Sequence, residues 1–346
     1  MLLGPDRKRL PEGVRLDLPT YKRMPKGYSD PHDLPEHTAG FLGKVLGPLL
    51  RKWGVNRLGY AMAGPVTEDG VQVVAPQIWG PSVTNVPYRK MLEDALGLPG
   101  RVLHGNDMWA AASDIIARGA SRKPPLDSQN FVVITVSSGI GSKVVVNGKV
   151  QLGVEGLAGE IGHMPVLWPS DIIPGRRCGC GELYCLEAGS SGDATAFRAK
   201  AEADRLRPLM DASASGKLIE TISAITLEPG EDLPARAKAI NTAVVSAARR
   251  DDPLAVSILN ASTRPLARAI SALENQLNIT NYYFVGGYAL ALGDRFLGTL
   301  REALLEYGII GRTTEQIMQI GRMYKVGAQD WGLRGAAMAA LHRSDE

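Results

Sequence analysis

The sequence predicts an α/β protein of two lobes, on three grounds. Runs rich in β-branched residues alternate with longer runs whose apolar residues recur every three or four positions, as strands and helices alternate in α/β folds. A chain of 346 residues is too long for one simple core and suits two lobes. Hydrophobic residues make up 45% and charged residues 22%, which is ordinary for a globular protein.

The first part of the chain predicts a small lobe made of residues 1–120 and completed by a C-terminal helix at 331–346. β-Rich runs predict strands at 13–18, 57–63 and 101–103, the last running into Asn106-Asp107. Helical periodicity predicts helices at 34–53, 88–96 and 110–119.

The remaining residues, 121–330, predict a large lobe, entered through a Pro-containing loop at 121–128. Strands are expected at 131–136 and 143–146, around a Gly-rich turn, and at 281–285. Helix formers dominate 193–275, with loops near 228–232 and 251–253, and an Ala-rich helix is expected at 331–341.

Charge and hydropathy narrow the possible partners and the location of the protein. A net charge of +3 with scattered basic residues disfavours nucleic-acid binding. No apolar run approaches the roughly 20 residues that cross a bilayer, and the first residues lack the pattern of a signal peptide. We therefore expect a cytoplasmic protein with no membrane partner.

All three cysteines fall within eight residues, at Cys178, Cys180 and Cys185, shortly after His163. An odd, clustered set indicates metal binding rather than disulfides. One imidazole and three thiolates supply the four ligands of a closed structural zinc site, which leaves no open position for catalysis. The alternative is three unrelated buried thiols, because free cysteine often packs as a small hydrophobe.

Asn106-Asp107 stands where a predicted strand approaches a helix. A hydroxyl that attacks a γ-phosphate must lose its proton, and a fixed carboxylate can accept it. Taken alone, such a pair is more often a turn or a helix N-cap.

Two glycine turns are candidate phosphate or nucleotide sites. The first is Ser137-Ser138-Gly139-Ile140-Gly141-Ser142, and the second is Gly286-Gly287 after an apolar strand. Glycines let backbone N–H groups approach a phosphate. A plain hairpin explains the first turn equally, and close packing explains the second.

Read together in this order, the blocks resemble the ROK family (repressors, open reading frames and kinases), above all in GEIGH, CGCG and CLE at 159–163, 178–181 and 185–187. The resemblance, over roughly residues 57–342, implies an actin-like (ribonuclease-H-like) fold of two lobes with a cleft between them. It also implies ATP, Mg²⁺, a structural Zn²⁺, a sugar or cyclitol substrate and a homodimer.

The same resemblance implies a role for each candidate residue. Asp107 would be the general base, and Asn106, Glu160, His163 and Glu187 would hold the sugar. The zinc ligands would be His163, Cys178, Cys180 and Cys185. The residues at the nucleotide would be Ser138, Gly139, Gly141, Gly286 and Gly287.

The chain departs from the family pattern at four places. The segment between His163 and Cys178 is longer than usual, Tyr184 stands where glycine is common, and Met108-Trp109 replaces small polar residues. The turn Asp-x-Gly-Gly-Thr, whose Asp helps to hold magnesium in actin-like sugar kinases, does not occur. A start lying upstream, a degenerated turn and a loss of phosphoryl transfer each explain its absence.

The sequence therefore predicts an ATP- and magnesium-dependent kinase acting on a hydroxyl of a hexose, an amino sugar or a cyclitol. The rival hypothesis is a ROK-type sugar-binding protein without catalysis. A transcriptional regulator is disfavoured because no basic recognition helix precedes residue 57. A zinc-stabilised scaffold without a ligand is the third hypothesis.

Overall fold

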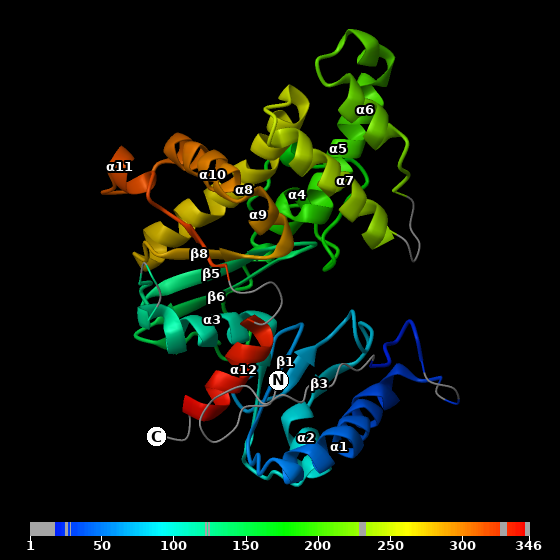
Figure 1. Ribbon diagram of the computed structural model, residues 1–346, viewed down its shortest axis with the longest axis vertical. Helices are drawn as coiled ribbons and strands as arrows, with labels where there is room; N and C mark the ends of the chain where they lie inside the picture. The colour runs from blue at the N-terminus through cyan, green and yellow to red at the C-terminus, as the bar shows by residue number, and fades with distance from the viewer. Residues whose placement is uncertain are drawn as a thin grey trace. The chain divides into compact units, whose positions relative to one another are not determined.

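The computed structural model describes residues 18–24, 27, 29–121, 123, 125–227, 233–325 and 331–342. They form two compact units (Figure 1). The first unit contains the described parts of 18–130, 143–159 and 331–342, and the second those of 131–142 and 160–325. The predicted strand at 13–18, apart from Leu18, and the predicted loop at 228–232 lie outside the described residues.

The first unit is built on two small sheets. Strands β1 (Leu58–Met62) and β4 (Val102–Asn106) run parallel, with Met62 opposite Asn106. Strands β2 (Gln72–Val74) and β3 (Thr84–Val86) pair antiparallel. The sequence predicted β1 and β4 but missed β2 and β3, because three residues are too few to show a period of two.

Two helices of the first unit pack against each other and share its hydrophobic core. They are α1 (Leu34–Lys52) and α2 (Tyr88–Leu96), both close to their predicted bounds. The fully buried rings of Trp79 and Tyr88 lie edge to face, 4.7 Å apart, in this core. Short 3₁₀ turns precede α1 at Pro31–Asp33 and follow α3 at Gly119–Ser121.

The C-terminal helix α12 (Trp331–His342) packs on α3 (Asp107–Arg118) and on β1 (Figure 1). A Cβ atom at Gly335 would lie 1.7 Å from the Ala110 carbonyl oxygen, so only glycine permits this approach. Residues separated by more than 200 positions thus meet at one helix crossing, and α12 fixes the helix that Asp107 begins.

A buried ion pair reinforces the same helix crossing. The Arg334 guanidinium donates two hydrogen bonds to the Asp114 carboxylate, at 2.8 and 2.6 Å. The Asp114 side chain is 0% exposed, and that of Arg334 is 20% exposed. Removing one partner of a buried pair leaves the other charge uncompensated, which is far more costly than removing both.

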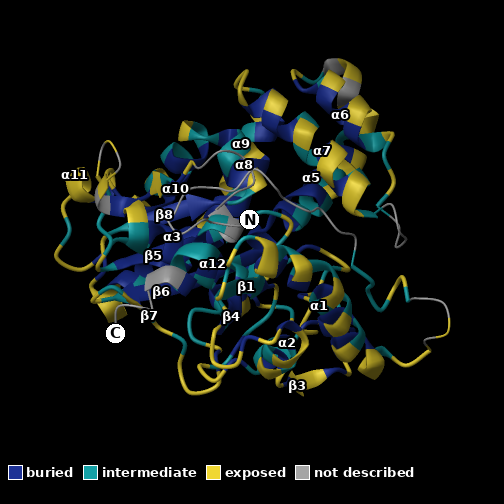
Figure 2. Cartoon of the chain, turned by 60° about the horizontal axis from the view of Figure 1, so that its bottom comes forward, coloured by how far each residue is buried: buried dark blue, intermediate teal, exposed yellow. Residues whose placement is uncertain are grey.

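A third sheet has five strands in the order β7-β6-β5-β8-β9. Its parallel central pair, β5 and β8, is almost wholly buried, as Figure 2 shows, and reads in the sequence as continuous apolar runs. Strand β9 continues the parallel pairing, whereas β7 pairs antiparallel with β6. The strands are β5 (Phe131–Val136), β6 (Ile140–Val146), β7 (Lys149–Val150), β8 (Tyr282–Val285) and β9 (Arg322–Met323).

Helices make up most of the second unit, as the sequence predicted for 193–275. The longest helix described is α8 (Pro253–Leu277), which packs on four other helices, α10, α4, α5 and α7. No helix among the described residues is both long and apolar enough to cross a membrane. The helices are α4 (Leu186–Ser190), α5 (Gly192–Leu206), α6 (Gly216–Ser223), α7 (Leu233–Ala248), α8 (Pro253–Leu277), α9 (Gly287–Leu292), α10 (Asp294–Tyr307) and α11 (Thr314–Ile317), with 3₁₀ turns at Ile161–His163, Pro169–Asp171 and Arg207–Ala212.

We expect Arg334→Leu to destabilise the first unit by about 3–5 kcal/mol, because it leaves the Asp114 carboxylate buried without its cation. Urea unfolding measures this loss. The double variant with Asp114→Leu should regain most of it, since an apolar pair can replace a buried ion pair at little cost. Lys90→Met removes an exposed ion pair with Asp94 and should change stability by no more than about 0.5 kcal/mol. Equal losses in the single and double variants would contradict this prediction.

Candidate functional site

The four predicted metal ligands lie together in the second unit. One ligand atom each from His163, Cys178, Cys180 and Cys185 falls within 4.8 Å of all the others. His163 Nδ1 lies 3.4 Å from Cys178 Sγ, and the sulfurs of Cys180 and Cys185 lie 3.5 Å apart. A tetrahedral zinc site with bonds of about 2.3 Å places its sulfurs about 3.8 Å apart. The donor set and its spacing therefore fit such an ion.

The three thiols have unequal acidities because they share one small space. Burial raises the pKa of Cys178 and of Cys185. Although burial also opposes ionisation of Cys180, hydrogen bonds from the Glu182 backbone and from its neighbouring thiols and His163 lower its pKa to about 7. Three adjacent thiolates repel one another, so the cluster needs a cation to ionise fully.

Short backbone contacts fold the two halves of the metal cluster onto each other. Pro165 forms an isolated antiparallel bridge with Cys185, and the Leu186 N–H donates to the Met164 carbonyl at 2.9 Å. The Cys178 N–H donates to the Glu182 carbonyl at 2.9 Å, closing a tight turn around the first two thiols. The histidine turn and the cysteine turn are thus held together by the chain itself.

Asn106 and Asp107 lie in the first unit, where strand β4 passes into helix α3. The Asn106 side-chain oxygen accepts the Trp109 N–H at 2.6 Å, so it is the N-cap of α3. Asp107 is the first helical residue, and one of its carboxylate oxygens accepts the Met108 N–H at 2.9 Å. The helix begins three residues before the predicted start at Ala110, because Asn106 caps it.

Trp109, a departure from the family pattern, is accommodated by a glycine. A Cβ atom at Gly105 would lie 2.3 Å from the Trp109 ring, so the indole packs flat against bare backbone. A cavity of about 380 Å³ in the first unit is lined by this ring, together with Thr67, His104 and Lys149. Sequence patterns do not reveal this cavity, because its walls come from separate segments.

His104 is a buried residue that the sequence did not single out. Its ring packs against those of Tyr60 and Tyr88, with centroids 5.4 and 5.7 Å away, and the two tyrosine rings also contact each other. Burial, together with the nearby positive charge of Arg89, lowers the pKa of His104 to about 4. The neutral ring places Nδ1 3.3 Å from the Gly70 carbonyl oxygen, which only accepts, so Nδ1 carries the proton.

The first glycine turn is shorter than predicted. Ser137, Ser138 and Gly139 connect β5 to β6, while Ile140 and Gly141 already belong to β6, three residues before its predicted start. The turn is held by the start of helix α5, whose Gly192 N–H donates to the Ser137 carbonyl at 2.7 Å. The loop thus has a fixed shape set by a neighbouring helix.

Glu187 approaches the same turn. Its Oε2 accepts the Ile140 N–H at 3.0 Å. A Cβ atom at Gly139 would lie 2.6 Å from that oxygen, so any other residue there would displace the Glu187 carboxylate. Glu187 follows the predicted metal ligand Cys185 by two residues, and the cysteine segment therefore contacts the glycine turn directly.

The second glycine turn lies beside the first. Gly286, at φ +95°, places its α-hydrogens against the Val136 carbonyl, where a Cβ atom would come within 2.5 Å. Ser138 and Gly287 line one cavity of about 600 Å³ within the second unit. The sequence missed the residues that α5 and α7 add to this cavity, among them Asp193, Lys238, Asn241 and Thr242.

The predicted site residues are thus divided between the two units. Asn106 and Asp107 belong to the first unit. Glu160, His163 and Glu187 belong to the second, as do the two glycine turns. Within the second unit, the structure brings the metal ligands to one cluster and brings Glu187 to the glycine turn.

Comparison with known proteins gives a consistent result. The ROK family profile matches residues 26–343. The chain is 36% identical to a C(7)-cyclitol 7-kinase of Streptomyces hygroscopicus subsp. limoneus over 84% of this chain and 81% of that protein. The crystal structure of a ROK hexokinase from Thermus thermophilus matches with a TM-score of 0.63 and 26% identity, over 93% of this chain and 90% of that one.

A ROK family transcriptional regulator, a homolog of the Escherichia coli MLC protein, also has a similar structure. Its TM-score is 0.62 at 22% identity, over 88% of this chain and 68% of that one. This likeness shows the fold alone. The matches confirm the predicted actin-like α/β fold, while the fold by itself does not separate an enzyme from a regulator.

We expect the stability of the first unit to fall as the pH drops from about 6.5 to about 4. His104 binds a proton in the unfolded chain at about pH 6.5, but in the folded protein only near pH 4, so acid favours unfolding. Between pH 7.5 and 5.0 the loss from this group should be about 2 kcal/mol. Urea unfolding of the protein and of His104→Gln at both pH values measures it. Equal pH dependence in the two proteins would contradict this assignment.

Proposed function

The chain belongs to the ROK family, and from that premise we propose that it is a kinase that transfers the γ-phosphoryl group of ATP to a hydroxyl of a sugar or cyclitol. The observation that carries the proposal is the 36% identity to a C(7)-cyclitol 7-kinase over most of both chains. N-acetylmannosamine kinase of Escherichia coli O6:H1 is a second relative, 33% identical over 51% of this chain.

Asp107 is the proposed general base. Its carboxylate accepts the proton of the acceptor hydroxyl while that oxygen bonds to the γ-phosphorus and the bond to ADP breaks. The position at the first turn of α3 favours the ionised carboxylate, because helix N-termini stabilise negative charge. The hydrogen bond from the Met108 N–H fixes one carboxylate oxygen, and α12 fixes the helix.

The acceptor is held by Asn106, Glu160, His163 and Glu187 in this proposal. The Asn106 oxygen caps α3, which leaves its amide N–H groups for a hydroxyl. Trp109 replaces a small residue of the family pattern and packs on Gly105. This change near the base favours a ring that differs from glucose, and a cyclitol, which lacks a ring oxygen, agrees with the similar kinase.

The nucleotide binds at the two glycine turns in this proposal. Ser138 and Gly287 line the cavity of about 600 Å³, Gly139 follows Ser138 in the same turn, and Gly286 permits the second turn. Lys238, on α7, adds positive charge to the cavity. A bound Mg²⁺ would neutralise negative charge on the phosphates.

Zinc is the proposed occupant of the His163 and cysteine cluster, as a structural ion. Four protein ligands close the coordination shell, so the ion shapes the loops without entering the reaction. Its chemical contribution is to hold three thiolates and one imidazole at a single point. The ion would thereby hold the turn that carries Glu160 and His163 against the segment that carries Glu187.

A sugar-binding protein without catalysis is the second candidate, and one observation favours it. The Asp-x-Gly-Gly-Thr turn, which receives phosphate oxygens in actin-like kinases, is absent from the sequence. The structural likeness to a ROK family regulator shows that this fold also exists outside enzymes. Retention of Asp107, of the glycine turns and of the metal cluster favours the kinase.

We expect the full chain to phosphorylate at least one compound in a panel of C7-cyclitols, N-acetylhexosamines and hexoses with ATP and Mg²⁺. Asp107→Asn should lower kcat by about 100-fold or more, because the base is lost while the shape is kept. A coupled assay for ADP release measures turnover. The control, Asp94→Asn on the exposed face of α2, should leave kcat unchanged.

Binding without turnover would support the second candidate function instead. Calorimetry with the same panel would show a dissociation constant for one compound, and Asp107→Asn would leave that constant close to the starting value. Turnover that survives Asp107→Asn would overturn the assigned base while leaving the kinase in place.

Glu187 is expected to affect both substrates, because its carboxylate contacts the glycine turn. Glu187→Ala removes the acceptor of the Ile140 N–H, and we expect the KM for ATP to rise about 10-fold, as for loss of a hydrogen bond to a charged group. Glu187→Gln keeps an oxygen at that point and should keep the KM for ATP near its starting value. If Glu187→Ala raises only the KM for the acceptor, the turn does not depend on Glu187.

A further inference from the structure

The Arg268 guanidinium holds part of the segment between His163 and Cys178. This segment is longer than in the family pattern. Arg268, in the middle of α8, donates to the Val166 carbonyl and, at 3.0 Å, to Oδ2 of Asp171. Its second terminal nitrogen donates to the Tyr307 hydroxyl at 3.1 Å. Its side chain is 14% exposed, so these contacts are largely shielded from solvent.

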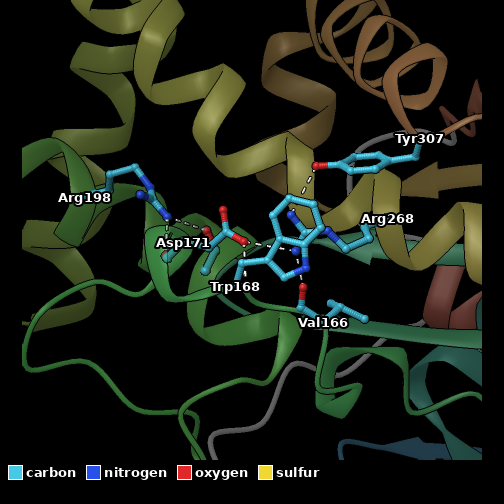
Figure 3. A network of polar contacts seen from close by, with 7 residues as sticks. Val166, Trp168, Asp171, Arg198, Arg268 and Tyr307 are labelled. Atoms are coloured by element: carbon cyan, nitrogen blue, oxygen red, sulfur yellow. Dashed lines mark hydrogen bonds and ion pairs between the residues drawn. The ribbon is translucent and has the colours of Figure 1, made fainter.

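Two aromatic rings also contact this guanidinium, as Figure 3 shows. Its central carbon lies 3.7 Å from the centre of the Trp168 ring and 5.2 Å from that of Tyr307. One face of the Trp168 indole packs on Arg268, although the residue as a whole is 53% exposed. The cation is enclosed by Trp168 from the inserted segment and by Tyr307 at the end of α10.

Two residues that Arg268 contacts, Val166 and Trp168, flank Leu167 in the sequence. Leu167 packs against the proposed metal ligands Cys178 and Cys185. Leu167 is 5% exposed and shares a small core with Cys178, Cys185 and Ala188. Its N–H donates to the Tyr184 carbonyl at 3.1 Å. Arg268 binds the carbonyl before this leucine and the ring after it, so it fixes the side chain that covers two of the thiols.

Asp171 joins the segment to a second helix. Its carboxylate accepts the Trp168 N–H at 2.8 Å as well as Arg268, and its carbonyl accepts Arg198 from α5 at 2.8 Å (Figure 3). The 3₁₀ turn at Pro169–Asp171 is therefore held from both α5 and α8. Movement of the segment would break contacts with both helices.

We propose that Arg268 is a positioning residue for the metal centre, which clamps the segment Val166–Leu167–Trp168 over the cysteine cluster and slows loss of the ion. The inference rests on the proposed zinc site and not on kinase activity. Outer-shell partners of metal ligands typically contribute 10–100-fold to metal affinity. Arg268 acts through Leu167 rather than on a ligand, so the lower end of that range applies.

The test measures zinc release from the full-length, zinc-loaded protein to a chromophoric chelator, at a temperature well below unfolding. Arg268→Ala should release zinc about 10-fold faster than the unchanged protein. Arg268→Lys keeps a positive charge near Asp171 and should recover part of the difference. Arg264→Ala is the matched control, because Arg264 lies one turn earlier on α8 and pairs with Glu306 of α10 in an exposed position.

Four results would overturn the proposal. One is release from Arg268→Ala at the rate of the unchanged protein, and another is equal acceleration by Arg264→Ala. If Arg268→Ala does not fold, Trp168→Leu and Arg268→Lys replace it, and unchanged rates in both decide against the clamp. Metal analysis showing far less than one zinc per chain in the unchanged protein would overturn the zinc assignment and this role together, whatever the kinase assay shows.

Discussion

The hydrogen bond from the Ile140 N–H to the Glu187 carboxylate is the contact on which the second unit's site depends. It joins the turn between β5 and β6 to the start of α4, directly after Cys185, one of the proposed metal ligands. Because the Gly192 N–H holds the other side of the turn, the loop is fixed at both ends. Glu187, which holds the loop, is thus only two residues from the cysteine cluster.

In the first unit, two contacts between α3 and α12 set the position of Asp107. The position of Asp107 follows from α3, and α3 is set by the close approach of Gly335 in α12 and by the buried pair of Asp114 with Arg334. Neither constraint involves Asp107 itself. The Asp107 side chain, proposed as the base, is thus placed by a backbone contact and an ion pair farther along α3. Helix α12, the last described helix, completes the first unit.

The sequence predicted the fold and most of the candidate site, because strong periods and tight motifs are local signals. Cys178, Cys180 and Cys185 lie so close along the chain that their grouping can be predicted without tertiary information. Strands β5 and β8 are recognisable in the sequence as apolar runs. His104 and Lys238 gave no such signal, because burial against rings and membership of a cavity wall arise only on folding. Helix α3 begins three residues before its predicted start at Ala110, because the Asn106 side chain caps it.

The departures from the family pattern follow a physical rule. Two of the bulky rings lie where a neighbour can receive them: Trp109 lies on Gly105, which has no side chain, and Trp168 lies on the Arg268 cation, whereas Tyr184 is exposed. An added ring that displaced its neighbours would move the Asn106 cap or the thiol cluster, and each is intact. The changes therefore alter the surface near the site without altering the spacing of the groups proposed for chemistry. A difference in acceptor specificity, rather than loss of the reaction, is the consequence that this arrangement favours.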